Sequence, residues 1–159
     1  MKTSTQRILR AGLGGLLLAT GTGKALDVTG FAGVLATYRL GIPADALWPL
    51  ALAIAVLEIF LGLWILAGWR VGPALRLSIA LDAVYFVVLE SALVRGLALT
   101  NCGCFGVYLA SPLRWYTPLE EILLVTLAVW LLRLDRDSAR GSAARTDRST
   151  GTGHAPDGS

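Results

Sequence analysis

The two cysteines of the chain stand two positions apart, in the run Asn101-Cys102-Gly103-Cys104-Phe105-Gly106. Two thiols at this spacing can form a disulfide if the chain turns between them, and Gly103 and Gly106 permit such a turn. A disulfide across one residue closes a small, strained ring, which adds little loop-closure stabilisation. Because strained and exposed disulfides are typical of labile or catalytic pairs, we predict that Cys102 and Cys104 are redox-active.

The residues beside the pair suggest which cysteine attacks the partner and which one resolves the mixed disulfide. In a thiol–disulfide exchange, one sulfur attacks the partner and the other resolves the mixed disulfide. Phe105 and Gly106 offer an apolar edge with close backbone access, so we expect Cys104 to face the partner. We predict no metal site, because the usual co-ligands are missing: His154 is the single histidine. The alternative is that both cysteines are small apolar residues of a loop.

Four charged residues interrupt or flank the apolar runs of the sequence. Glu58 and Asp82 lie near the middle of two such runs, where an ionisable group is costly and usually faces the interior of a helix bundle. We expect at least one of them to carry a proton, because burial and a like-charged neighbour both disfavour ionisation. Lys24 and Glu90 lie near the ends of their runs, and we expect them to pair across the mouth of the bundle. Alternatively, these groups only bond helices to one another.

The elements that position these residues are helices that cross a membrane. The chain has 159 residues, 55% hydrophobic and 16% charged, and its apolar residues come in long runs. A bilayer core requires about 20 apolar residues in a helix. We predict an all-α integral membrane protein, a four-helix bundle in the lipid bilayer, with spans at 8–26, 47–68, 71–94 and 119–134.

Two features of the first third of the chain refine this prediction. Small residues at four-residue spacing let helices approach closely, and the first span has them at Ala11, Gly15, Ala19 and Gly23. The alternative for this span is a signal peptide, since basic residues precede its apolar core. Apolar residues at 31, 34, 35 and 38 predict a short amphipathic helix at the membrane interface, in the first outer loop.

The basic residues predict the orientation, because Lys and Arg accumulate on the cytoplasmic side of membrane proteins. One side of the four spans carries ten of the 14 basic residues, namely Lys2, Arg7, Arg10, Arg70, Arg76, Arg133, Arg136, Arg140, Arg145 and Arg148. The other side carries Lys24, Arg39, Arg95 and Arg114. We therefore expect both termini in the cytoplasm and the Cys102/Cys104 loop outside it, in a multi-pass protein of a bacterial cytoplasmic membrane. The net charge of +3 is thereby explained without nucleic acid as a partner.

The composition changes after residue 134. Residues 135–159 contain no Ile, Leu, Val or aromatic residue and are rich in Ser, Thr, Gly, Arg and Asp. Such a segment buries too little apolar surface to fold, so we predict a membrane domain over 1–134 and a disordered cytoplasmic tail over 135–159.

Taken together, these residues resemble the MauE/DoxX family of redox-associated membrane proteins. The resemblance covers about residues 7–134 and rests on Gly21, Gly23, Lys24, Asp27, the segment 31–38, Glu58, Gly62, Gly68 and the cysteine run. It implies a four-helix membrane bundle in which Cys102 and Cys104 are the redox pair. The MauE branch is linked to methylamine utilisation, where it works beside a thioredoxin-like partner in maturing methylamine dehydrogenase.

The combined expectation is a membrane protein that exchanges thiol and disulfide with an extracytoplasmic thioredoxin-like protein. Related membrane systems use two cysteine pairs, whereas this chain has one. A complete relay would therefore need a partner's cysteines, or a membrane quinone bound near Glu58 and Asp82 as terminal acceptor. Two alternatives stay open: a non-catalytic anchor or assembly subunit of a respiratory or dehydrogenase complex, and a small-molecule or proton pathway centred on the two acids. The client, the direction of electron flow and the oligomeric state stay open as well.

Overall fold

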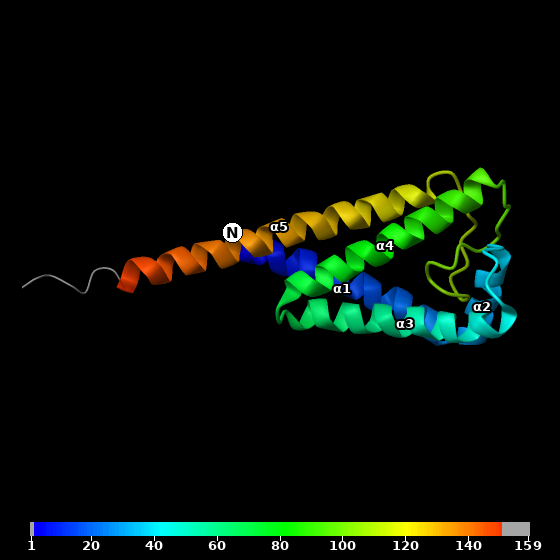
Figure 1. Ribbon diagram of the computed structural model, residues 1–159, viewed down its shortest axis with the longest axis horizontal. Coiled ribbons are helices and arrows are strands. Elements are labelled where there is room, and N and C mark those ends of the chain that lie inside the picture. Colours follow the sequence, from blue (N-terminus) through cyan, green and yellow to red (C-terminus); the bar gives the residue numbers. More distant parts are fainter. Residues whose placement is uncertain (1, 151–159) are drawn as a thin grey trace, which may run out of the picture.

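The computed structural model describes residues 2–150, with side chains described for residues 4–136, and this part of the chain is entirely helical apart from its loops (Figure 1). Its five helices are α1 (Lys2–Ala25), α2 (Val28–Thr37), α3 (Ala44–Ala67), α4 (Val71–Val94) and α5 (Thr117–Thr150). The prediction of an all-α protein is confirmed.

The helix ends follow from local sequence. The carboxylate of Asp27 caps α2 by accepting the N–H of Gly30 at 2.7 Å, which satisfies one of the free amides of a helix start. Gly68 ends α3 in the left-handed conformation at φ +76°, and its N–H donates to the carbonyl of Trp64. Helix α4 begins only three residues later, so α3 and α4 form a tight hairpin.

The long helices pack mainly as two pairs, α1 against α3 and α4 against α5 (Figure 1). The main core lies between these pairs and is aliphatic. Its fully buried members include Leu13 of α1, Leu61 and Ile65 of α3, Leu75 of α4, and Ala128 and Leu131 of α5. Close packing of these side chains joins the four long helices through many van der Waals contacts.

The close approach of α1 to α3 uses a different set of glycines from the one predicted. A Cβ atom on Gly62 would lie 2.8 Å from the carbonyl oxygen of Gly14, and one on Gly21 would lie 2.8 Å from the backbone nitrogen of Ile59. In contrast, a Cβ on Gly15 would meet nothing within 4 Å. The predicted stripe through Gly15 is therefore wrong: spacing shows that small residues share a face, and not which face meets the neighbouring helix.

Helix α2 and the loop between α4 and α5 close one end of the bundle (Figure 1). The predicted amphipathic helix is present, but the structure buries part of its apolar face against protein. Phe31 and Ala32 pack on Ala51 of α3, and Tyr38, which follows α2, packs with Leu89 of α4. The expected position of α2 at a membrane interface stays a prediction.

Helices α3 and α4 are each 24 residues long and apolar enough to cross a membrane. At 1.5 Å per residue, such a helix spans about 36 Å, which exceeds the ~30 Å hydrocarbon core of a bilayer. Helices α1 and α5 are more polar, because α1 carries Arg7, Arg10 and Lys24 and α5 carries Glu120, Glu121 and several arginines. Their length and composition alone do not identify them as spans.

Helix α5 does not end near residue 134, where the predicted fourth span ends. It continues to Thr150 and extends past the other helices (Figure 1). The segment lacks Ile, Leu, Val and aromatic residues but contains Ala and Arg, which favour helix locally even without packing. The predicted disordered tail over 135–159 thus differs from the helix over 135–150, and its residues 151–159, including His154, lie outside the described residues.

Candidate functional site

Asn101 fixes the shape of the loop that carries the two cysteines. Its side-chain Oδ1 accepts the N–H of Gly103 at 2.8 Å, and its Nδ2 donates to the carbonyl of Gly106 at 3.0 Å. The backbone N–H of Cys102 donates to the carbonyl of Ser111 at 2.7 Å, which ties the pair to the returning half of the loop. One side chain therefore bridges both ends of the turn.

Both glycines of the run have backbone conformations that other residues adopt only with strain. Gly103 has φ +79° and Gly106 has φ +75°, so the turn expected between the cysteines is present. A Cβ on Gly106 would also collide with the carbonyl oxygen of Gly23 at the end of α1. The run thus needs glycine at both positions: Gly103 for the turn and its close contact with Val34 and Phe31 of α2, and Gly106 for its close contact with α1.

The two sulfur atoms lie side by side, with Cys102 Sγ 3.0 Å from Cys104 Sγ. Both residues are half-buried free thiols in this structure. The hydrogen bond from the Cys104 thiol lowers the pKa of Cys102 to about 6, while its bond to Cys102 and burial raise the pKa of Cys104 above its ordinary value. Near neutral pH, the electrostatics favour a Cys102 thiolate and a protonated Cys104.

The hydroxyl of Tyr38 supports the pair from α2. It donates to the carbonyl of Cys102 at 2.6 Å. Burial and the neighbouring cysteines raise the pKa of Tyr38, so the phenol keeps its proton and remains a donor. Tyr38 is one of the residues that the sequence interpretation assigned only to an apolar helix face.

Lys24 joins the cysteine loop to the helix bundle. Its ammonium donates to both carboxylate oxygens of Glu58, at 2.8 and 2.7 Å, and to the carbonyl of Cys104 at 2.9 Å. The side chains of this ion pair are 3% and 1% exposed. A buried charge needs a partner and hydrogen bonds to offset its desolvation, and here the cysteine loop supplies one of these bonds.

The predicted ion pair between Lys24 and Glu90 is wrong. Glu90 lies on the exposed face of α4, whereas the buried face of that helix includes Ser78, Asp82 and Leu89. Lys24 reaches Glu58 instead, because α1 packs along α3 and the two residues meet at that contact. Glu90 therefore lies on a different face of α4 from Asp82.

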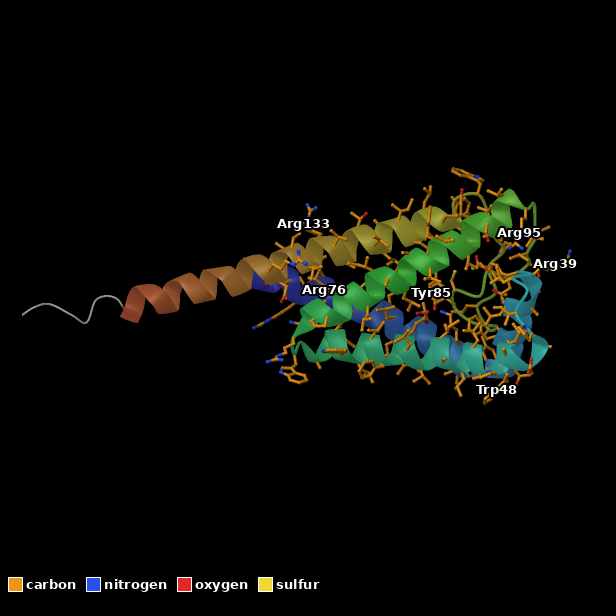
Figure 2. The ribbon with its side chains drawn as sticks, viewed as in Figure 1. Arg39, Trp48, Arg76, Tyr85, Arg95 and Arg133 are labelled. Atoms are coloured by element: carbon orange, nitrogen blue, oxygen red, sulfur yellow. The ribbon has the colours of Figure 1, made fainter. Side chains whose placement is uncertain are left out.

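A hydroxyl and two further carboxyl groups surround the Lys24–Glu58 pair. Tyr85 of α4 donates its hydroxyl to Glu58 Oε1 (Tyr85 is labelled in Figure 2). Asp82 of α4 and Glu121 of α5 are also buried, and each has one carboxyl oxygen without a hydrogen-bond partner in the described part of the chain. Glu58 and Asp82 are thus both in the interior, as expected.

Sequence reasoning missed Glu121 and Tyr85. The signal for Glu121 was present in its spacing, because it shares one face of α5 with Leu124, Ala128 and Leu131. A carboxyl group that continues a buried stripe points to the interior.

Two cavities flank this cluster. One of about 50 Å³ is lined by both cysteines, Tyr38 and Tyr85. The other, of about 210 Å³, is lined by Cys104, Phe105, Asp82 and Glu121. The expectation that Phe105 forms an outward edge for a partner does not fit this placement, because Phe105 lines the inner cavity and its carbonyl packs on Gly23.

This arrangement can hold one thiolate next to one thiol, on a loop fixed by hydrogen bonds from Asn101, Tyr38 and Lys24. That is the requirement for thiol–disulfide exchange, in which the thiolate attacks and its neighbour resolves.

Comparison with known proteins identifies one family and one relative that match most of the chain. Residues 2–134 match the family described as methylamine utilisation protein MauE. The chain is 30% identical over 121 residues to the methylamine utilization protein MauE of Paracoccus denitrificans, which covers 76% of this chain and 64% of that protein. The match thus spans less than two thirds of this relative's length. No solved structure matches the chain.

Proposed function

This chain belongs to the MauE family, and we propose that it is a membrane thiol–disulfide redox protein that supports maturation of an extracytoplasmic, disulfide-containing client of the methylamine dehydrogenase type. The observation that carries the proposal is the geometry of the pair: Cys102 and Cys104 have their sulfurs 3.0 Å apart, on a loop held by the buried Lys24–Glu58 pair. The family relation supplies the link to methylamine utilisation.

In the proposed exchange, the Cys102 thiolate reacts first. The Cys102 thiolate attacks a disulfide sulfur of the partner, the partner's S–S bond breaks, and its leaving sulfur takes a proton. Cys104 loses its proton and attacks Cys102 Sγ, so the Cys102–Cys104 bond forms and the second partner thiol leaves. Two electrons thereby pass from the pair to the partner, and the reverse sequence moves two electrons from a partner dithiol to the pair.

We assign the partner to the thioredoxin-like class, because a dithiol of that class exchanges through the same mixed disulfide. The surface near the pair supports this assignment. Tyr108 and Leu109 of the cysteine loop are both more than two thirds exposed, which gives a partner apolar contact area on the same loop as the two cysteines.

The chain is proposed to cross the membrane four times, with α1 and α5 accompanying α3 and α4. Helix α1 packs along α3, and α5 packs along α4. Helix α5 also exposes apolar side chains on its outer face, among them Leu119, Ile122, Leu123 and Trp130. An exposed apolar face on a helix paired with an apolar span is suited to lipid contact.

The orientation of the chain in the membrane is proposed from the basic residues at the two ends of the bundle. Figure 2 shows Arg76 and Arg133 at the end where the chain begins, and Arg39 and Arg95 at the end that holds the cysteine loop. Because the first end carries the larger share of basic residues, we place both termini in the cytoplasm and the cysteine loop outside it, in a bacterial cytoplasmic membrane.

The proposal is tested with the full-length protein in detergent micelles. The oxidised protein is mixed with reduced thioredoxin, and the free thiols of both proteins are counted by alkylation and mass spectrometry. We expect the Cys102–Cys104 bond to be reduced with formation of one thioredoxin disulfide per pair. Asn101→Leu should slow this exchange, because it removes both bonds that shape the turn.

A second measurement links the exchange to the client. In a host that requires this protein for growth on methylamine, the Cys102→Ser/Cys104→Ser double variant should abolish client maturation, while a Glu90→Gln control should behave like the parent. Maturation by the double variant at the parental level would contradict the redox function and favour an anchor or assembly subunit.

A further inference from the structure

We propose that the larger cavity below the cysteine loop binds the ring of a lipid-soluble quinone, which takes up electrons from the reduced Cys102–Cys104 pair. This inference rests on the proposed redox function and gives it a direction. The cavity, of about 210 Å³, lies among the four long helices α1, α3, α4 and α5 and the cysteine loop. Most of its walls are apolar, formed by Leu13, Leu17, Leu124 and Phe105.

Two unpartnered carboxyl oxygens identify this cavity as a ligand site. Asp82 Oδ2 and Glu121 Oε2 have no hydrogen-bond partner among the described residues, and the two residues are only 2% and 6% exposed. Both line the same cavity, from two different helices. A buried polar atom without a partner is costly, so a pair of them facing one apolar cavity indicates a ligand that brings its own polar groups.

The chemistry of the lining favours an uncharged ligand with an apolar body. A metal cation is disfavoured, because the ammonium of Lys24 lines the same cavity and Glu58 is already bonded to it. The carboxyl groups of Asp82 and Glu121, held in an apolar cavity, are suited to donate hydrogen bonds to carbonyl oxygens. A quinone ring carries two carbonyl oxygens on an apolar ring.

The cavity also extends from Cys104 to the exposed apolar face of α5, which is proposed to face the lipid. Cys104 is part of its wall and also lines the smaller cavity, where Cys102 lies; Lys24 and Tyr85 line both cavities. Leu123 lines the cavity too, yet this side chain is 68% exposed on the outer face of α5. A ligand can therefore enter past Leu123 from the lipid side, which selects a lipid-soluble electron acceptor.

The reaction balances with the quinone as oxidant. The Cys102 thiolate and the Cys104 thiol together lose two electrons and one proton, and the Cys102–Cys104 bond forms; the proton of Cys102 has already passed to solvent when its thiolate formed. The quinone takes up the same two electrons, and its two carbonyl oxygens take up two protons, which gives the quinol. Asp82 and Glu121 are the groups placed to deliver these protons to the ring oxygens.

The test uses the full-length protein in phospholipid nanodiscs with ubiquinone-1 as the probe. Leu123→Trp places a large side chain over the entrance, and Ile122→Trp is the matched control on the same exposed face, outside the cavity lining. We expect saturable binding to the parent and to Ile122→Trp, and about tenfold weaker binding to Leu123→Trp. Unsaturable partition of ubiquinone-1, or equal binding to all three proteins, would overturn the proposal.

A second variant tests the proton groups without filling the cavity. Glu121→Gln keeps a hydrogen-bond donor but cannot deliver a proton. With the pair reduced chemically by dithiothreitol, which is then removed, the rate of ubiquinone-1 reduction should fall about a hundredfold while binding stays at the parental level. An unchanged rate would rule out Glu121 as a proton donor to the quinone and overturn that part of the proposal.

These measurements separate the quinone site from the exchange with thioredoxin. Leu123→Trp should still be reduced by thioredoxin at the parental rate, because it leaves the cysteine loop intact. If the parent fails to react with thioredoxin but binds ubiquinone-1 in a Leu123-dependent manner, the quinone site stands and the proposed function fails. If thioredoxin reacts and ubiquinone-1 does not bind, the quinone site is wrong and the proposed function stands.

Discussion

At the scale of single residues, the two sulfurs of the loop have different environments. Cys104 is held through its carbonyl by Lys24 and through its thiol by Cys102. The backbone of Cys102 is held by Tyr38 and Ser111, and its sulfur accepts the hydrogen bond of the Cys104 thiol, so this sulfur can carry the negative charge. This difference favours Cys102 over the expected Cys104 as the sulfur that attacks the partner in the proposed exchange, because the attacking sulfur is the one whose thiolate is stabilised.

The first prediction concerns the pH dependence of Cys102. In the reduced protein, its alkylation rate should rise with a midpoint near pH 6, because the thiolate reacts and the bond from Cys104 lowers the pKa. Cys104→Ala removes that bond, so the midpoint should move up toward about 8.5, the ordinary value for cysteine. Iodoacetamide labelling followed by peptide mass spectrometry measures both midpoints. A parental midpoint above pH 8 would contradict the assignment of Cys102 as the attacking sulfur.

Part of the site could be predicted from residue types. A closely spaced cysteine pair, and charges within apolar runs, are visible in any sequence, and Cys102, Cys104, Lys24, Glu58 and Asp82 do come together in this structure. The pairing of these charges could not be predicted. It depends on which faces of α1, α3 and α4 meet, and helix periodicity gives the relative faces within one helix only.

At the scale of helices, the contact between α1 and α3 positions Lys24. Backbones approach closely at Gly14 and Gly62, and this brings the end of α1 against the middle of α3, where Lys24 meets Glu58. Length and hydrophobicity predicted where the helices lie. They did not predict which face of α1 meets α3. They also did not predict the extension of α5 to Thr150, because a helix can form by residue propensity alone, where no hydrophobic periodicity marks it in the sequence.

The second prediction tests this helix contact. Gly62→Ala adds a methyl group 2.8 Å from the Gly14 carbonyl oxygen, so we expect a loss of about 1–3 kcal/mol in the free energy of unfolding. Gly12→Ala is the control, since a Cβ there meets nothing within 4 Å, and it should be neutral or stabilise by up to about 1 kcal/mol. Denaturant titration in micelles, followed by circular dichroism, measures both. Equal stability of the two variants would show that α1 and α3 do not meet at Gly62.

At the scale of the whole molecule, the two ends of the bundle differ in the residues that they carry and in the segments that close them. The end with the α3–α4 hairpin carries Arg70 and Arg76, while the opposite end is closed by α2 and the cysteine loop (Figures 1 and 2). Between them lies the buried Lys24–Glu58 pair. An extracytoplasmic pair above a membrane-embedded cavity would connect a partner in solution with an acceptor in the lipid.

The third prediction concerns this orientation. In intact spheroplasts treated with a reductant, Cys102 should react with a membrane-impermeant maleimide added from outside. A cysteine introduced at Ser138 should react only after the membrane is opened, because we place both termini in the cytoplasm. Labelling of Cys102 only in inverted vesicles would reverse the topology and remove the loop from the compartment of its partner.

The redox exchange itself is tested most directly by trapping the mixed disulfide in cells. Cys104→Ser keeps the attacking sulfur and removes the resolving one, so a covalent complex with a thioredoxin-like protein should accumulate. It should appear as a shifted band on a non-reducing gel, disappear on reduction, and be absent from the Cys102→Ser/Cys104→Ser variant. Absence of any trapped protein in both single-serine variants, together with normal client maturation, would contradict thiol–disulfide exchange as the function of this loop.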